Sequence, residues 1–227
     1  CKGNFRPEYL AMAKGQGAIA YVAEQEYPAG GDLPAIIVNN EQKAMALLGA
    51  AFYGFPQNKL QIIAITGTKG KTTTAYFADH ILSQTTAKHV ALFSTLDRVL
   101  GNGPADRFKS DLTTPESLDL FHDMWVAVNN GMTHLVMEVS SQAYKKLRTF
   151  GLHFNVGAFL NITPDHIGRN EHPTFADYLH CKEQLLVNSQ TCVINAETDH
   201  FTDVYYTAKA TTQPEDIYLF ARHGADC

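Results

Sequence analysis

The sequence predicts an α/β protein whose main part is a phosphate-binding-loop domain on a mostly parallel sheet. Apolar segments rich in β-forming residues alternate with helical segments from residue 58 onward. One of these predicted strands runs into a glycine-containing loop and then into a helix. Strands that alternate with helices form parallel sheets with helices on both faces. The turn-rich residues 54–58 indicate a domain boundary. We therefore expect part of a small α/β N-terminal domain over residues 1–57 and the main domain over 58–227.

The predicted N-terminal domain contains two helices and two short strands. Residues 7–14 should form a short helix, and residues 18–22 and 35–38 are apolar runs typical of strands. A second helix should run over 41–53, with Asn40 as its cap. We expect the apolar face of this helix to carry Ala44, Leu47, Leu48 and Ala51.

The main domain shows the regular alternation. Thr114 followed by Pro115 is typical of a helix start, with a capping hydroxyl and a proline in the first turn. Strands are expected at residues 61–66, 89–94, 134–139, 155–161, 191–195 and 216–220. Helices are expected at residues 71–83, 115–130, 173–188 and 200–207.

Composition restricts the possible functions. The chain of 227 residues is 45% hydrophobic, which suffices for a sizeable core. A net charge of -5 without any basic stripe argues against nucleic-acid binding. No apolar stretch approaches the roughly 20 residues of a membrane-spanning helix, so we expect no membrane contact. The four cysteines lack CxxC spacing, which favours a cytoplasmic protein with reduced thiols.

The most informative segment is the loop Thr66-Gly67-Thr68-Lys69-Gly70-Lys71-Thr72. Gly67 and Gly70 allow backbone N–H groups to approach phosphate oxygens closely, and the following helix directs its positive end at the same anion. Lys71 can reach the terminal phosphates, and the Thr72 hydroxyl can bind Mg²⁺. Ile65 stands where the usual phosphate loop has its first glycine, so the loop is a variant. A simple glycine turn is disfavoured because strand, loop and helix follow in the right order.

This loop resembles that of the Mur ligase family, whose form is Thr-Gly-Thr-x-Gly-Lys-Thr. Together with three further segments, it is similar to the type that adds the third residue of the cell-wall peptide. The resemblance covers almost the whole chain, from inside the family's N-terminal domain to inside its central ATPase domain. It implies a fragment, because Cys1 is not a methionine and the family's C-terminal domain is missing. The further segments are Thr113-Thr114-Pro115, Met137-Glu138-Val139-Ser140-Ser141, and Asn161-Ile162-Thr163-Pro164-Asp165-His166 leading to Lys182.

The resemblance implies a defined reaction. ATP phosphorylates the free carboxylate of UDP-MurNAc-L-Ala-D-Glu, and the amine of a free amino acid attacks the acyl phosphate. Phosphate then leaves the tetrahedral intermediate. Such chemistry depends on positioning and on neutralising phosphate charge. The implied cofactors are ATP and Mg²⁺, and we expect a monomer.

The resemblance also assigns the metal and catalytic residues. Thr72, Glu138, His166 and a carbamylated Lys182 would hold the metal, and Lys71, His166 and Lys182 would be catalytic. Glu138 ends a predicted strand at the carboxyl edge of the sheet, where open parallel sheets bind ligands. Two alternatives stay open: Glu138 is a solvated strand end, or His166 is a loop imidazole bonded to a carbonyl. Without the resemblance, Lys182 would be interpreted as a surface lysine, and carbamylation needs its neutral amine.

For the sugar-nucleotide substrate the resemblance points to a second set of residues. Hydroxyl groups and an arginine suit the recognition of phosphates and carboxylates. Thr114 is also expected to cap a helix, and Arg148 stands beside Lys145 and Lys146, so a solvated basic cluster is an alternative. The implied substrate-binding residues are Thr113, Thr114, Ser140 and Arg148.

Two departures from the family pattern concern specificity. Lys69 replaces the asparagine common in this loop, and Gln142 stands where many relatives have histidine. Both are similar to lysine-adding enzymes, so we expect L-lysine rather than meso-diaminopimelate. Two other functions stay open: a folylpolyglutamate synthase-like ligase and a non-catalytic nucleotide-binding module. We expect the 227 residues alone to have little or no ligase activity.

Overall fold

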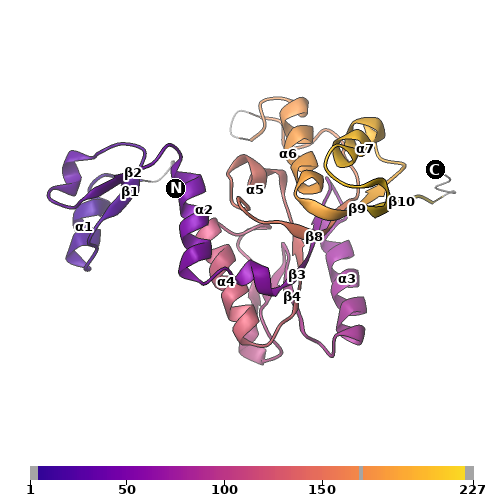
Figure 1. The fold of residues 1–227 in the computed structure, drawn as a ribbon, viewed down its shortest axis with the longest axis horizontal. Coiled ribbons are helices and arrows are strands. Elements are labelled where there is room, and N and C mark those ends of the chain that lie inside the picture. Colours follow the sequence, from indigo (N-terminus) through magenta and orange to yellow (C-terminus); the bar gives the residue numbers. More distant parts are fainter. Residues whose placement is uncertain (1–4, 169–170, 223–227) are drawn as a thin grey trace.

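The computed structural model describes residues 5–168 and 171–222. Within them, eight strands form the main sheet, and the predicted strands of the main domain are all present. They are β3 Gln61–Thr66, β4 Val90–Phe93, β5 Asp97–Val99, β6 Arg107–Lys109, β7 His134–Glu138, β8 Phe154–Phe159, β9 Ser189–Asn195 and β10 Ile217–Phe220. Their order across the sheet is β10-β9-β8-β3-β7-β4-β5-β6 (Figure 1).

The sheet is mostly parallel, as predicted. All neighbouring pairs from β10 to β4 are parallel, and the two pairs at the other edge, β4–β5 and β5–β6, are antiparallel. This hairpin is absent from the prediction because each of its strands has three residues and mixes charged with apolar side chains. Asp97 and Arg107 form an ion pair across it. The hairpin therefore depends on pairing with β4 and not on a hydrophobic run of its own.

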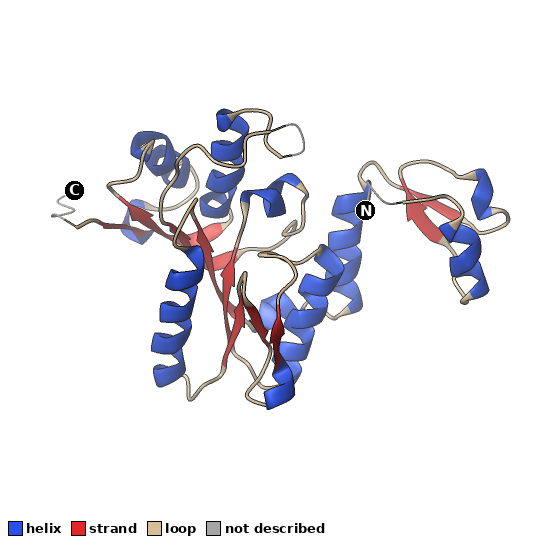
Figure 2. Ribbon diagram, turned by 180° about the vertical axis from the view of Figure 1, so that it is seen from behind, coloured by secondary structure: helices blue, strands red, loops and turns tan. Residues whose placement is uncertain are grey.

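Helices cover both faces of the main sheet, which confirms the predicted α/β architecture (Figure 2). One face packs against α3 through a small apolar cluster that includes Ile65, Ala75 and Leu92. The other face carries the larger core, with Phe121, Tyr178 and other fully buried residues from the remaining helices. The helices are α3 Lys71–Thr85, α4 Ser117–Asn129, α5 Ser141–Lys145, α6 Phe175–Val187 and α7 Phe201–Lys209.

The start of α4 differs from the prediction. The helix begins at Ser117 after Glu116, and no side chain caps it. The Thr114 hydroxyl instead donates to the Glu138 carbonyl at 3.1 Å and accepts from the Ser140 N–H at 3.1 Å. The expected capping role of Thr114 is therefore wrong, because its hydroxyl contacts the segment that follows β7.

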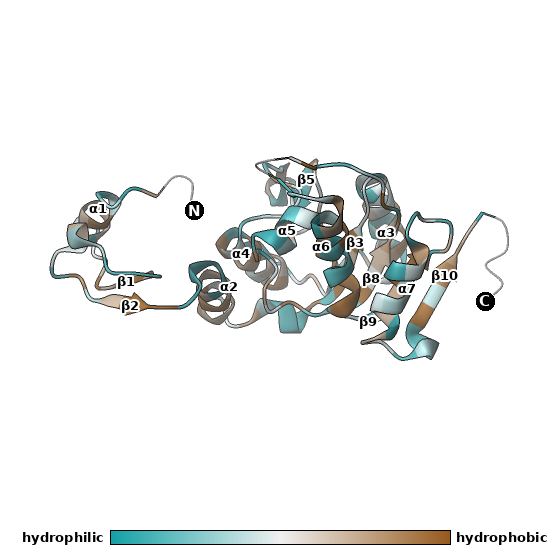
Figure 3. Ribbon diagram, turned by 90° about the horizontal axis from the view of Figure 1, so that it is seen from above, coloured by the Kyte–Doolittle hydropathy of each residue, from teal (hydrophilic) through white to brown (hydrophobic). Residues whose placement is uncertain are grey.

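The N-terminal elements form a small unit beside the main body (Figures 1 and 3). It contains α1 Tyr9–Gly15 and the parallel pair β1 Tyr21–Ala23 and β2 Ala35–Ile37. Helix α2 Glu41–Phe52 follows and leads toward the main body. Asn40 caps it as predicted, because its Oδ1 accepts from the Lys43 N–H at 2.9 Å.

The predicted apolar face of α2 is wrong. Leu47 and Leu48 are each 52% exposed, and Ala51 is also exposed. The face that packs on α4 is made of small buried residues instead. A Cβ on Gly49 would lie 3.2 Å from Leu118 Cδ2 and 3.3 Å from Phe121 Cδ2. The two helix backbones approach so closely that small residues, not leucines, form the contact. These residues are Ala46, Gly49 and Ala50.

The opposite side of α2 faces the N-terminal unit. Met45 and Leu48 line a cavity of about 620 Å³ together with Leu10, Tyr21 and Tyr27 of that unit. Helix α2 thus contacts both parts of the chain. The domain boundary at residues 54–58 stays a prediction of the sequence.

Two further observations concern the composition. Among the described helices, none is long and apolar enough to cross a membrane. Cys181 and Cys192 are free and buried, whereas Cys1 and Cys227 lie outside the described residues.

Gly157 in the central strand β8 provides a test of this packing. A Cβ there would lie 2.1 Å from Ser189 Oγ and 2.8 Å from Leu185 Cδ2. We expect Gly157→Ala to lower the free energy of unfolding by about 2 kcal/mol, because a filled core must shift to admit the methyl group. Gly15→Ala is the matched control, since nothing lies within 4 Å of its added Cβ. Thermal unfolding of both variants checks this; equal midpoints would contradict the packing.

Candidate active site

The phosphate loop joins β3 to α3 at the carboxyl end of the sheet. Gly70 has a left-handed backbone (φ 85°) and precedes the first residue of α3, Lys71. A Cβ on Gly67 would lie 3.0 Å from Leu160 Cβ and 3.3 Å from the Lys69 carbonyl oxygen. Both positions therefore favour glycine on steric grounds. The first N–H groups of a helix have no partner within the helix, so the start of α3 is suited to bind an anion.

Asn161 fixes the loop from the segment that follows the neighbouring strand β8. Its Oδ1 accepts from the Lys69 N–H at 2.9 Å, and its Nδ2 donates to the Lys69 carbonyl at 3.0 Å. The Thr68 N–H donates to the Asn161 carbonyl at 3.0 Å. An amide side chain can make this paired contact because it carries both a donor and an acceptor. The role of Asn161 was not predicted, although its segment belongs to the family motif.

Thr68 connects the loop to α6. Its Oγ1 accepts from the Thr163 N–H at 3.0 Å and shares a hydrogen bond with the Tyr178 hydroxyl, also at 3.0 Å. Tyr178 is fully buried. Nothing in the sequence singles out this tyrosine, which lies 110 positions from Thr68.

Two lysines meet at one carbonyl oxygen of the loop. Lys71 Nζ donates to the Gly67 carbonyl at 2.9 Å, and Lys182 Nζ donates to the same oxygen at 2.8 Å. Lys182 is only 2% exposed, and its Nζ lies 4.9 Å from the centre of the Tyr178 ring. Interpreting Lys182 as an ordinary surface lysine is therefore wrong.

Burial and like charge shift the pKa values of these two amines. Burial, followed by the nearby charge of Lys71, lowers the pKa of Lys182 to about 7. Burial also lowers the pKa of Lys71, and the charges of Glu138 and Asp165 partly offset this. Near neutral pH a substantial fraction of Lys182 is therefore the neutral amine.

Glu138 is fully buried at the end of β7, so the alternative of a solvated strand end is wrong. Its Oε1 accepts from the Thr95 N–H at 2.8 Å, and its Oε2 accepts from the Thr95 hydroxyl at 3.0 Å. Thr95 was not predicted, because it lies between β4 and the hairpin that the sequence did not reveal. Thr72, in the first turn of α3, is partly exposed and offers a second oxygen donor. Both donors suit Mg²⁺, which prefers oxygen ligands.

His166 is placed differently from Glu138. Its side chain is 51% exposed, and its Nδ1 lies 2.9 Å from Glu171 Oε1. The alternative of a carbonyl partner is wrong, since the partner of the ring is the Glu171 carboxylate. Among the described residues, Glu138 and His166 share no group of three close His, Cys, Asp or Glu ligand atoms.

The predicted substrate-binding residues lie close together at the ends of β4 and β7. Thr95 Oγ1 is 3.1 Å from Thr113 Oγ1, which links this cluster to Glu138. The Thr114 hydroxyl lies between Glu138 and Ser140, and Ser140 also caps α5 through the Ala143 N–H. Hydroxyl groups from three separate segments therefore meet beside a buried carboxylate.

Arg148 is buried and contacts the backbone of this cluster. It is 6% exposed, so the alternative of a solvated basic cluster is wrong. Its Nη1 donates to the Thr114 carbonyl at 3.2 Å, and its Nη2 pairs with Glu116 Oε1 at 2.6 Å. Its buried Nε has no hydrogen-bond partner among the described residues.

A family model and curated relatives both match this chain. Residues 65–225 match the Mur ligase middle domain. The UDP-N-acetylmuramyl-tripeptide synthetase of Limosilactobacillus reuteri (strain DSM 20016) is 82% identical over 226 residues, covering 100% of this chain and 44% of that protein. The chain thus spans less than half the length of the curated relatives it matches.

Solved structures share the fold. A UDP-N-acetylmuramoyl-L-alanyl-D-glutamate–2,6-diaminopimelate ligase matches with a TM-score of 0.73 and 23% identity, over 95% of this chain and 42% of the other. A Mycobacterium tuberculosis folylpolyglutamate synthase complexed with ADP matches with a TM-score of 0.54 and 16% identity. That match covers 80% of this chain and 46% of the other. At these identities the likeness concerns the fold alone.

Proposed function

The chain belongs to the Mur ligase family, and we propose that it is the ATP-binding part of a UDP-N-acetylmuramyl-tripeptide synthetase. The observation that carries this proposal is the meeting of Lys71 and Lys182 on the Gly67 carbonyl of a phosphate loop. Lys71 brings a cation to the phosphates there, and the buried Lys182 lies within reach of the same loop for a metal-binding role. The complete ligase would couple ATP hydrolysis to the joining of UDP-MurNAc-L-Ala-D-Glu and a free amino acid.

In this proposal residues 66–72 bind ATP. The N–H groups at the start of α3 and of the loop would contact phosphate oxygens, and Lys71 would offset charge on the transferred phosphoryl group. The loop is held rigid by Asn161 and Tyr178, so it needs little rearrangement to bind. The M. tuberculosis folylpolyglutamate synthase with the same fold is complexed with ADP, which supports nucleotide binding by this fold.

The same proposal assigns a Mg²⁺ site. Thr72 and Glu138 would hold the ion, with His166 and a carbamylated Lys182 completing the site. When bound, Mg²⁺ neutralises charge on the phosphates. Carbamylation would turn Lys182 from a cation into an anion. Its burial and its pKa of about 7 support this, because carbamylation requires the neutral amine.

Thr113, Thr114, Ser140 and Arg148 would hold the sugar-nucleotide dipeptide. Its free carboxylate would lie close to the terminal phosphate, so that an acyl phosphate forms and the incoming amine then displaces phosphate. Arg148 fixes the Thr114 backbone, while its partner Glu116 orients the guanidinium group. Positioning of this kind supplies much of the rate enhancement in group transfer.

An ATP-dependent ligation assay of the complete ligase tests the function. With UDP-MurNAc-L-Ala-D-Glu as acceptor, we expect phosphate release that depends on the amino acid and is faster with L-lysine than with meso-diaminopimelate. Faster release with meso-diaminopimelate would contradict only the amino acid assigned. No release with either one, but ligation to a folate, would favour a folylpolyglutamate synthase-like ligase. Amino acid-dependent release by the 227 residues alone would contradict the prediction that they are inactive.

A further inference from the structure

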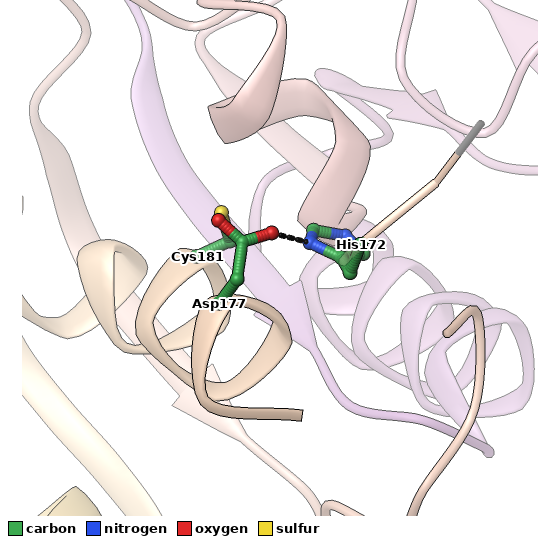
Figure 4. Close-up of side chains that lie close together, drawn as sticks. All are labelled: His172, Asp177 and Cys181. Atoms are coloured by element: carbon green, nitrogen blue, oxygen red, sulfur yellow. Dashed lines mark hydrogen bonds and ion pairs between the residues drawn. The ribbon is translucent and has the colours of Figure 1, made fainter. Parts of the chain in front are cut away.

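His172 is a fully buried imidazole between α5 and α6, and both of its ring nitrogens are engaged. Its Nδ1 lies 2.6 Å from Asp177 Oδ2 on α6 (Figure 4). Its Nε2 lies 2.9 Å from Ser141 Oγ, in the first turn of α5. The ring therefore bridges two helices that the chain connects only through β8 and a long loop.

The direction of these hydrogen bonds follows from Asp177. Its carboxylate also pairs with Lys145 Nζ at 2.8 Å, and this hydrogen bond is the main cause that holds the Asp177 pKa below its usual range. An ionised carboxylate only accepts, so Nδ1 of His172 donates to it. In the neutral ring Nε2 then accepts from the Ser141 hydroxyl.

Two other roles for this cluster are disfavoured. Cys181 completes a group whose ligand atoms all lie within 4.8 Å of one another, which suggests a metal site (Figure 4). Burial raises the pKa of the Cys181 thiol to about 11, however, and Lys145 already pairs with Asp177, so the group lacks a thiolate and a free carboxylate. The Ser141–His172–Asp177 order is also that of a hydrolase triad, but Ser141 is only 3% exposed, so no substrate reaches its hydroxyl.

The bridge continues into the nucleotide site. The His172 ring packs edge-on against Tyr178, with 5.2 Å between ring centroids. The Tyr178 hydroxyl bonds to Thr68 of the phosphate loop, and Lys182 Nζ lies over the same ring. At the other end, Ser141 follows directly on Ser140. A continuous set of buried contacts thus joins Ser140 to the phosphate loop.

We propose that His172 is a positioning residue that holds the start of α5, with Ser140, at a fixed separation from α6, with Lys182. This rests on the proposed function, in which Ser140 belongs to the dipeptide site and Lys182 to the ATP and Mg²⁺ site. Transfer of a phosphoryl group to a carboxylate requires both substrates in a near-attack geometry. The bridge would therefore affect turnover more than the binding of either substrate.

Substitutions at both ends of one hydrogen bond test the proposal in the complete ligase. Asn at position 172 can still reach Asp177 but not Ser141, whereas Gln can reach Ser141. We expect His172→Asn and Ser141→Ala each to lower kcat about 10- to 100-fold, with the KM for ATP changed less than about threefold. His172→Gln should retain more activity than His172→Asn. The double variant H172N/S141A should be no slower than the worse single variant, because both remove the same contact.

His180→Asn is the matched control, because His180 is an exposed histidine of the same helix. Its kcat should stay at the native value. If His172→Asn does not fold, Ser141→Ala carries the test, since it removes a single oxygen atom. Native kcat in Ser141→Ala, or losses that only follow the fraction of unfolded protein, would overturn the positioning role while the function stands. An inactive native ligase would instead overturn the function on which this proposal rests.

Discussion

Replacing Lys71 with alanine should lower the turnover of the complete ligase by at least about 10³-fold, because one cation at the transferred phosphoryl group is lost. Lys71 is the first residue of α3, and its amine already lies against the loop carbonyls of Gly67 and Thr68, at 2.9 and 3.3 Å. No other residue of α3 can place a cation there without moving the helix. The measurement is the ligation rate at saturating substrates.

The control for this substitution is Lys209→Ala. Lys209 is the exposed last residue of α7, outside the phosphate loop, and its loss should leave turnover unchanged. Native turnover in Lys71→Ala would remove the phosphate loop from the mechanism. Equal losses in both variants would indicate that lysine charge acts in a general way and not at the phosphates.

Replacing Lys182 with methionine should change activity and stability in opposite directions. Ligation should fall by about 10²-fold or more, because a proposed metal-binding carbamate can no longer form. Compared with the uncarbamylated protein, stability at pH 7 should rise by on the order of 2 kcal/mol, because the variant no longer buries an amine with a lowered pKa. The folded-state pKa of about 7 is below the ordinary 10.5 of the unfolded chain, so the unfolded chain binds more protons between these pH values.

The sign of the pH dependence follows from that difference. The buried Lys182 amine lowers the free energy of unfolding by its full amount below pH 7. This destabilisation decreases as the pH rises and is absent above the unfolded pKa of 10.5. The stability gain of Lys182→Met should therefore be largest at neutral or lower pH and small near pH 10. Urea unfolding at several pH values measures it. Lys182→Arg, which keeps the charge and cannot be carbamylated, should lose activity without gaining stability. Full activity in either variant would contradict the proposed role.

The fold was predictable wherever burial leaves a local pattern. Strands β3 and β7 lie in the middle of a parallel sheet with most of their residues buried, so each appears as a continuous apolar run. The β5–β6 hairpin has no such run. The predicted packing face of α2 is wrong because leucines usually mark the buried side of a helix, whereas the close contact with α4 needs Gly49 and its small neighbours.

The candidate site also has one part that the sequence predicts and one part that only the fold creates. The phosphate loop is contiguous, so its chemistry can be derived from seven consecutive residues. Asn161 acts on Lys69 across 92 positions, Tyr178 acts on Thr68 across 110, and Thr95 acts on Glu138 across 43. No spacing in the sequence predicts such contacts, because only the folded chain brings these distant positions together. The burial of Lys182, which changes its chemistry, is likewise a property of the fold.

Helix α2 has a mechanical consequence, because its two sides touch different parts of the chain. Ala46, Gly49 and Ala50 clamp it to α4, while Met45 and Leu48 face the N-terminal unit. Helix α2 is thus packed firmly on the main body and also contacts the N-terminal unit. If the N-terminal unit moves relative to the main body, the hinge should lie around residues 38–40, before α2. A hinge after α2 would break the close contact between α2 and α4.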